Sequence, residues 1–178
     1  MGKIKAGGII QNLNLAKIGV MCVPDRPGIA STVLSAVSKR GINVQFIAQA
    51  IDLNNKTHMI LCVDEIDLEE AFQVVESVKL EVQAEKVIYQ SNVAMVSVFG
   101  PHFRDYPGVA AIAFSALASS NINILAISTS ISTISCLIDG DRVIEAVEAL
   151  REAFDVPLGS VSTASPGLSL RSSAKVGG

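Results

Sequence analysis

The chain has 178 residues, which suits one domain of ordinary size or two small domains packed together. An apolar fraction of 49% and a charged fraction of 17% indicate a core-rich globular protein and exclude a disordered one. The net charge of −3 argues against a nucleic-acid-binding protein, which needs a basic face to displace counterions.

The first half of the chain alternates strand-like and helix-like segments. Runs of β-branched and apolar residues, which predict strands, lie at 7–12, 15–23, 43–51, 58–63 and 81–90. Apolar residues at helical spacing predict a helix after Pro27. A second helix is predicted from Asp67, which with Glu70 has the spacing of a capping box. Apart from the opening run, the order is βαββαβ, the order of a ferredoxin-like fold.

A near copy of this pattern returns 80 residues later. Aligning Pro27 with Pro107 places PGIASTVLSAVSKRGINVQFIAQAI over PGVAAIAFSALASSNINILAISTSI, with nine of the 25 positions identical and no gap. Strand-like runs follow the same order at 93–99, 123–130 and 133–138, and a last helix is predicted from Asp141, a candidate N-cap. Agreement over this length indicates two copies of one module.

The second copy lacks a fourth strand of its own, because residues 157–178 are polar and are predicted to form a flexible tail. The short apolar run at 7–12 has no partner in the first copy, so we expect it to complete the sheet of the second. The expected division is a first module at 16–90, a second module made of 7–15 plus 92–156, and a tail at 157–178. The first module is then inserted within the second.

The corner between the first strand and the first helix is the candidate binding site. In VPDRPGIAS, Asp25 can cap the helix, Pro27 can occupy its first turn, and Gly28 leaves the unpaired backbone N–H groups accessible. Such a helix start attracts a small anion such as a carboxylate. For one corner of this kind, a well-capped helix start with no ligand is the favoured interpretation. Its return at 106–111, with an I-N-V or I-N-I strand start 15 residues past each proline, favours the binding interpretation.

Other uses of this fold class are disfavoured. RNA-recognition modules stack bases on aromatic strand residues, and the equivalent strands here carry Phe46 alone. Metal carriers of this shape place a cysteine pair after the first strand, but Cys22 has no second cysteine beside it. The three cysteines sit in apolar runs, a pattern typical of reduced core thiols in a cytoplasmic protein, with a metal or redox role as the less favoured alternative: Cys22, Cys62 and Cys136.

No targeting or membrane segment is predicted. No apolar run reaches the roughly 18 residues that a membrane span needs, and MGKIKAGGII lacks the long apolar region of a signal peptide. We expect a cytoplasmic protein with no membrane or nucleic-acid partner.

The order of these motifs resembles the tandem ACT regulatory region of aspartate kinases (aspartokinases). The resemblance rests on VPDRPGIASTVLSAVSKRGINVQFIAQ, MVSVFG, YPGVAAIAFSALASSNINILAISTS and EAVEALREAF, and runs from about Ile9 to Val156. It implies an α+β fold of two ferredoxin-like βαββαβ ACT modules, the first inserted within the second. It also implies a homodimer formed through ACT modules, with an effector amino acid of the lysine or threonine type bound where modules meet.

The resemblance further implies effector-binding residues in each module. In the first module these are Asp25, Pro27, Gly28, Ile29 and Ala30 at the corner, with Asn43, Val44, Gln45 and Gln49 after it. In the second module they are Pro107, Gly108, Val109 and Ala110, with Asn123, Ile124, Ser128, Thr129 and Ser130. We expect no catalytic residue, no metal ligand and no cofactor.

Five positions depart from the family's usual residues. Gln45 and Leu125 stand where an acid commonly follows the I-N-[VI] motif to meet the effector's ammonium group, and Ile131 stands where Glu is usual. Gln45 can still accept a hydrogen bond, which favours the first site for binding. His58 and Arg151 stand where Asp and His are common. His58 is interpreted as an ordinary strand residue, with a titrating role as the less favoured alternative.

The sequence contains no Gly-rich phosphate cradle with a lysine and acids for a nucleotide and magnesium. We therefore expect that this chain alone does not phosphorylate aspartate. The implied function is sensing of an effector amino acid for feedback control of aspartate-family biosynthesis, lysine biosynthesis included. It would act with an aspartate kinase catalytic subunit or domain, or as a stand-alone protein derived from such a kinase. The alternative is a structural ACT protein that dimerises and senses no ligand.

Overall fold

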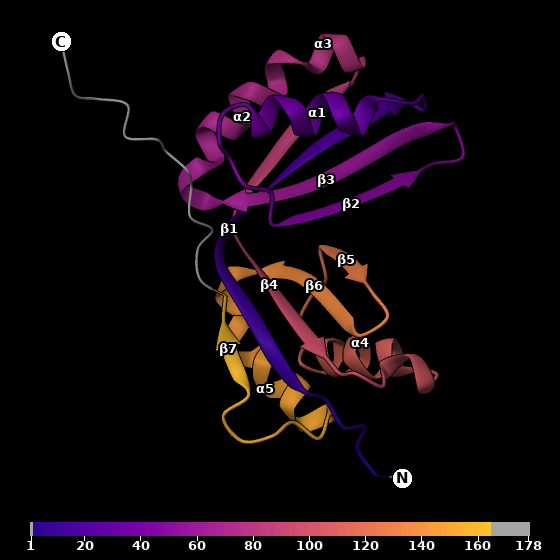
Figure 1. Cartoon of the computed structure of the whole chain (residues 1–178), viewed down its shortest axis with the longest axis vertical. Helices are drawn as coiled ribbons and strands as arrows, with labels where there is room; N and C mark the ends of the chain where they lie inside the picture. Colours follow the sequence, from indigo (N-terminus) through magenta and orange to yellow (C-terminus); the bar gives the residue numbers. More distant parts are fainter. Residues whose placement is uncertain (1, 165–178) are drawn as a thin grey trace, which may run out of the picture.

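The computed structural model describes residues 2–164, which form two α+β modules stacked along the long axis of the molecule (Figure 1). The strands are β1 (Gly8–Pro24), β2 (Phe46–Ile51), β3 (Lys56–Asp64), β4 (Lys86–Phe99), β5 (Ala126–Thr129), β6 (Thr133–Asp139) and β7 (Val161–Thr163). The α-helices are α1 (Ile29–Ser38), α2 (Leu68–Ser77), α3 (Lys79–Val82), α4 (Val109–Ser119) and α5 (Val143–Ala153). Short 3-10 turns are η1 (Glu65–Asp67), η2 (Phe103–Asp105) and η3 (Gly140–Arg142). This order confirms the predicted ferredoxin-like α+β fold.

One continuous sheet runs through both modules, in the order β2-β3-β1-β4-β6-β5 with β7 beside β1. β1 and β4 are long antiparallel partners that cross from one module to the other (Figure 1). Residues 8–12 of β1 pair with residues 95–99 of β4 in the second module. The later part of β1 pairs with β3 and with the start of β4 in the first module. The sequence predicts these four halves as separate strands, and that prediction is wrong.

Each long strand passes through one asparagine with a left-handed backbone. Asn14 in β1 has φ 56° and Asn92 in β4 has φ 50°. The pairing of β1 with β4 shifts register between Asn12 and Leu15, next to the first of them. Asparagine tolerates this conformation better than β-branched residues do, so each strand changes direction without ending. Hydrophobic periodicity is interrupted at the same points, which is why one strand is read as two.

Two helices cover one face of each module. Every fourth residue of α1 from Ile29 to Val37 is buried against the first half of the sheet. In the second module, every fourth residue of α4 from Val109 to Leu117 is buried in the same way. A third buried cluster draws on strands of both modules and joins them: Leu15, Phe46, Cys62, Val93 and Leu137.

The end of the chain differs from expectation. Val161–Thr163 forms β7, parallel to residues 9–11 of β1, in the segment predicted as a flexible tail. The remainder of that segment, 165–178, lies outside the described residues. The fourth strand of the second module is supplied by β1 and not by β7, which adds a further strand at the edge. The pairing of residues 8–12 of β1 with β4 is the one that an inserted first module requires. The residue boundaries expected for the two modules stay a prediction.

Two helix starts also differ. Asp141 is not an N-cap, because α5 has Arg142 at that position, and the Asp141 carboxylate instead accepts a hydrogen bond from the Asn92 side chain at 3.0 Å. Asp67 precedes α2, but no side-chain cap hydrogen bond forms there, so the predicted capping box is wrong. Within residues 2–164, no helix is long and apolar enough to cross a membrane.

Candidate functional site

The chain turns sharply where β1 ends and α1 begins. Gly28 is the N-cap of α1 and has φ 98°, a left-handed backbone that favours glycine. A Cβ atom at this position would meet no atom within 4 Å, so the backbone conformation, and not crowding, calls for glycine. No side chain caps the helix, and the first backbone N–H groups of α1 are therefore open to a ligand.

Two expectations about this corner are wrong. Asp25 does not cap α1; its Oδ1 atom accepts a hydrogen bond from Thr57 Oγ1 on β3 at 3.3 Å. Pro27 lies just before the N-cap and not in the first turn. On the other side of the loop, Arg26 donates a hydrogen bond to the backbone carbonyl of Glu81 at 2.7 Å. The loop is thus held from both sides before any ligand arrives.

A hollow of about 380 Å³ opens beside the corner. It is lined by Asp25, Arg26, Pro27, Gly28, Ile29, Ala30, Gln49 and Thr57. The predicted residues from 25 to 30 and Gln49 therefore do meet in space. Thr57 was missed because a threonine within a strand carries no signal of its own. The β2–β3 hairpin could have indicated it, since Thr57 pairs with Ile51, two residues beyond Gln49.

The second module repeats this geometry with a different lining. Gly108 is the N-cap of α4, has φ 88°, and likewise has no side-chain cap. A hollow of about 300 Å³ lies beside it, lined by Phe103, Arg104, Tyr106, Gly108, Val109, Ala110, Thr129, Ser130, Ile131 and Ile134. Asp105 corresponds to Asp25 across the repeat, but it pairs with His102 at 3.5 Å and does not line the hollow. The second corner is therefore more apolar than the first, and the sequence did not indicate its aromatic residues.

Part of the predicted set lies away from both hollows. Asn43 and Val44 precede β2 and do not line the first hollow, whereas Gln49, within β2, does. Asn123 and Ile124 hold the same place before β5. A single copy of the chain therefore does not bring the two halves of the predicted site together.

Gln45 is occupied by contacts within the chain. Its side-chain carbonyl accepts a hydrogen bond from Asn12 at 3.5 Å, and its amide donates to Asp64 at 3.4 Å. These contacts lie between β1 and the ends of β2 and β3, away from the first hollow. Ser128 and Pro107 likewise do not line the second hollow.

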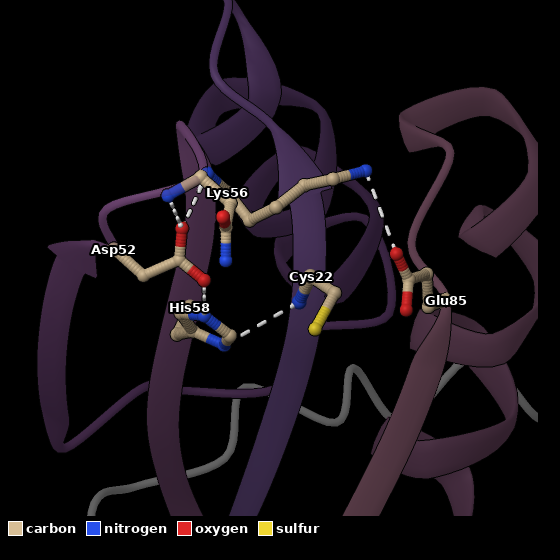
Figure 2. A network of polar contacts seen from close by, with 6 residues as sticks. Cys22, Asp52, Lys56, His58 and Glu85 are labelled. Atoms are coloured by element: carbon tan, nitrogen blue, oxygen red, sulfur yellow. Dashed lines mark hydrogen bonds and ion pairs between the residues drawn. The ribbon is translucent and has the colours of Figure 1, made fainter.

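His58, one residue after Thr57, belongs to a polar network beside the first corner (Figure 2). Its Nε2 atom lies 3.1 Å from Asp52 Oδ2, and its Nδ1 atom accepts a hydrogen bond from the backbone N–H of Cys22 at 3.4 Å. Backbone N–H donation from Lys56, together with the His58 contact, lowers the pKa of Asp52 below its ordinary value. The interpretation of His58 as an ordinary strand residue is therefore incomplete.

The other candidate residues carry no comparable site. Burial raises the pKa of the Cys62 thiol to about 12 and of the Cys136 thiol to about 11. Arg151 lies on α5 beside Lys3 and Glu148, apart from both corners. Across residues 2–164, no three His, Cys, Asp or Glu side chains are grouped so as to hold a metal ion.

Comparison with known proteins gives matches along the chain. Models of the ACT domain match residues 18–79 and 96–154. An aspartate kinase of Stutzerimonas stutzeri (strain A1501) is 37% identical over 157 residues, which cover 87% of this chain and 38% of that protein. An aspartokinase of Helicobacter pylori (strain 26695) is 37% identical over 149 residues, covering 84% and 36%. The chain thus spans somewhat more than a third of the length of the curated relatives it matches.

Solved structures show the same relationship over whole chains. The ligand-free regulatory subunit of aspartate kinase from Thermus thermophilus is 34% identical, with a TM-score of 0.76, and the match covers 84% of this chain and 98% of that one. A chain in the structure of aspartokinase alpha and beta subunits is 33% identical, with a TM-score of 0.77, and the match covers 84% and 99%.

Proposed function

This chain belongs to the family of ACT-domain regulatory regions of aspartate kinases, and from that premise we propose that it binds an effector amino acid at the corner before α1. The observation that carries the proposal is the hollow at that corner, which joins an uncapped helix N-terminus to the side chains of Asp25, Gln49 and Thr57. The effector is of the lysine or threonine type, and its binding provides feedback control of aspartate-family, including lysine, biosynthesis.

The two charged ends of an amino acid match groups at this corner. Its carboxylate accepts hydrogen bonds from the open N–H groups of α1, which contributes about 0.3–1 kcal/mol near a helix N-terminus. Its ammonium group pairs with the Asp25 carboxylate, which Thr57 holds at 3.3 Å. Gln49, on the strand opposite, is placed to contact the side chain of the effector. Asp25 thereby supplies the anion that the usual acid at Gln45 would have supplied.

A second copy of the chain completes the site. Asn43 and Val44, with their counterparts Asn123 and Ile124, lie at the entry of β2 and β5. β2 and β5 are the end strands of the sheet order and expose Ile47, Ile51 and Ile127, and Ile131 is exposed in the turn that follows β5. Exposed apolar edge strands are surfaces that pair with another chain. In the proposed homodimer, the strand entry of one copy faces the corner of the other.

Regulation follows by linkage. An effector that binds between two copies favours the arrangement of modules in which both halves of the site meet. The proposed recipient is an aspartate kinase catalytic subunit or domain in the cytoplasm, with a coupling free energy typically of about 1–3 kcal/mol. A relative among the solved structures comprises aspartokinase alpha and beta subunits, which supports a catalytic partner.

A second function is a purely structural one, in which the ACT modules dimerise and sense nothing. The observation that favours it is the state of two predicted ligand positions. Gln45 is bonded to Asn12 and Asp64, and the second corner presents Tyr106 and Ile131 without an acid. Both features are consistent with relaxed ligand binding.

Thermal unfolding with each of the 20 amino acids at millimolar concentration separates the two functions. A ligand that binds only the folded protein adds about 2.7 kcal/mol to the free energy of unfolding at a hundredfold excess over Kd, and thereby raises the melting temperature. Gln49→Ala should abolish the shift, because it removes a wall of the first hollow at an exposed position. Thr129→Ala, at the matching position of the second hollow, should leave it intact. A panel in which no amino acid shifts the melting temperature would support the structural function.

A further inference from the structure

We propose that His58 makes effector binding at the first corner depend on pH, because protonation of its ring releases the distorted part of β1 that leads into the corner. This inference rests on the proposed function of that corner as an effector site. It adds a regulatory input to the site, beyond the effector itself.

The distortion is a β-bulge opposite His58. Val20 pairs with Met59 and Val23 pairs with Thr57, so two residues of β1 stand opposite one residue of β3. The second of the two, Cys22, has φ 56°, a left-handed backbone that is rare for a cysteine. Its N–H group donates to Nδ1 of the His58 ring at 3.4 Å.

The ring of His58 links this bulge to the turn between β2 and β3 (Figure 2). A backbone N–H can only donate, so Nδ1 of His58 must be unprotonated to accept from Cys22. Nε2 then carries the hydrogen and donates to Asp52 Oδ2 at 3.1 Å. Asp52 in turn accepts from the backbone N–H groups of Asn54 at 2.8 Å and Lys56 at 3.0 Å. A neutral ring therefore accepts the hydrogen bond from Cys22 in the bulge and donates one to Asp52 in the turn at the same time.

Charged groups surround the ring on several sides. Asp52 comes from the turn, Lys56 from β3 and Cys22 from β1, while Glu85 lies just before β4 and pairs with Lys56 at 3.4 Å. Partial burial and the neighbouring Glu85 carboxylate raise the pKa of the Cys22 thiol, which therefore stays neutral. The position on β2 that pairs with His58 is Ala50, which carries no charge.

Sequence neighbours of this network line the effector corner. Thr57, next to His58, donates to Asp25 and lines the hollow. Gln49, next to Ala50 on β2, lines it from the same face of the β2–β3 hairpin as Thr57. Asp25 lies three residues after Cys22 of the bulge, and its N–H donates to the carbonyl of Asn55, in the same turn as Asp52, at 3.2 Å. The Cys22–His58–Asp52 contacts and the backbone at Asp25 are therefore joined through one turn.

Protonation changes the two contacts in opposite directions. A proton on Nδ1 places two N–H donors against each other, so the bond from Cys22 is lost, whereas the imidazolium is drawn to the Asp52 carboxylate. Val23 and Pro24 stay paired with β3, and the Asp25 N–H still donates to the Asn55 carbonyl at 3.2 Å. The bulge at Met21 and Cys22 loses its bond to the His58 ring and gains freedom, and this change shifts the paired segment that carries Asp25. Effector binding must restore its order, so affinity is high when the ring is neutral and falls as pH falls through the titration of the ring.

Calorimetry with L-threonine and with L-lysine, between about pH 8 and about pH 6, measures this dependence. Kd should rise at least roughly fivefold at the lower pH, the low end of typical coupling between sites. His58→Asn should remove the dependence, because the Asn carbonyl oxygen can still accept from the Cys22 N–H but does not titrate. His102→Asn is the matched control: His102 is the other histidine of the chain, is exposed and pairs with Asp105, and its loss should leave the pH dependence unchanged.

A second readout needs no effector. In ¹⁵N-labelled protein, the amide signals of Cys22, Asp25 and Gly28 should move with the titration of the His58 ring, and in His58→Asn they should stay still. Amides that ignore the ring titration overturn the inference whatever the effector results. Amides that follow it while neither amino acid binds support the switch and contradict the proposed function. A Kd that stays constant with pH while the amides move refutes the link to affinity.

Discussion

Gly28 and Gly108 are the two residues on which the candidate sites depend. Both adopt left-handed backbones at a helix N-cap, with φ of 98° and 88°. Their role was predictable, because a glycine that follows proline at a strand-to-helix corner, and returns at a fixed offset, indicates a turn that only glycine adopts readily.

The partners of the neighbouring acids were not predictable. Asp25 and Asp105 occupy the same place in the repeat, yet Asp25 is bonded to Thr57 and Asp105 pairs with His102. Each pairing depends on a residue brought near only by the fold.

The three cysteines provide a prediction at the residue scale. Cys62 and Cys136 are buried with pKa values of about 12 and about 11, whereas Cys22 is only partly buried. Because the thiolate is the reactive form, raised pKa values slow alkylation at pH below them. With iodoacetamide near neutral pH, mass spectrometry should find Cys22 modified slowly and alone, and faster as pH rises. The other two should react only after the protein is unfolded. Early modification of Cys62 or Cys136 in the folded protein would contradict their burial.

The elements themselves were predicted well where their periodicity is uninterrupted. Both pairs of covering helices and the β2–β3 and β5–β6 hairpins lie where the apolar patterns place them. The continuity of β1 and β4 was missed, since a single left-handed asparagine in each interrupts the pattern but not the hydrogen bonding. β7 was missed because three residues are too few to show alternation. The hydrogen bonds of Gln45 could not be predicted from periodicity, as they depend on how β1 crosses between modules.

The cluster at the module junction gives a prediction at the scale of elements. Leu137 of β6 is fully buried there against residues of the first module. Leu137→Ala should lower the free energy of unfolding by about 2–5 kcal/mol, through lost burial and the cavity left behind. Urea unfolding followed by circular dichroism measures the change. Ile144→Ala, on α5 and 75% exposed, should change stability by no more than about 0.5 kcal/mol. Equal effects of the two variants would mean that the junction does not stabilise the fold.

At the scale of the whole molecule, one sheet carries both modules and brings its two edges together. β2 and β5 are at opposite ends of the strand order, yet they contact each other and lie on the same side of the molecule (Figure 1). A second copy can therefore meet both edges, and both strand entries, in one interface. In the proposed homodimer, both corners of one chain can then face strand entries of the other copy. The proposed sharing of effector sites between copies requires that geometry.

The edges can be tested directly. Ile47 on β2 and Ile127 on β5 correspond across the repeat and are 44% and 43% exposed. The double variant Ile47→Lys with Ile127→Lys should convert the proposed dimer into a monomer of 18.7 kDa, because a lysine on an edge strand opposes pairing with another chain. Sedimentation equilibrium measures the mass. Ile144→Lys adds the same charge on α5, away from both edges, and should leave the dimer intact.

The double variant should also lose any amino-acid-induced rise in melting temperature, since each effector site needs the strand entry of the other copy. A monomer that still shows the full rise would place the complete site within one chain, and a dimer that survives both lysines would place the interface elsewhere.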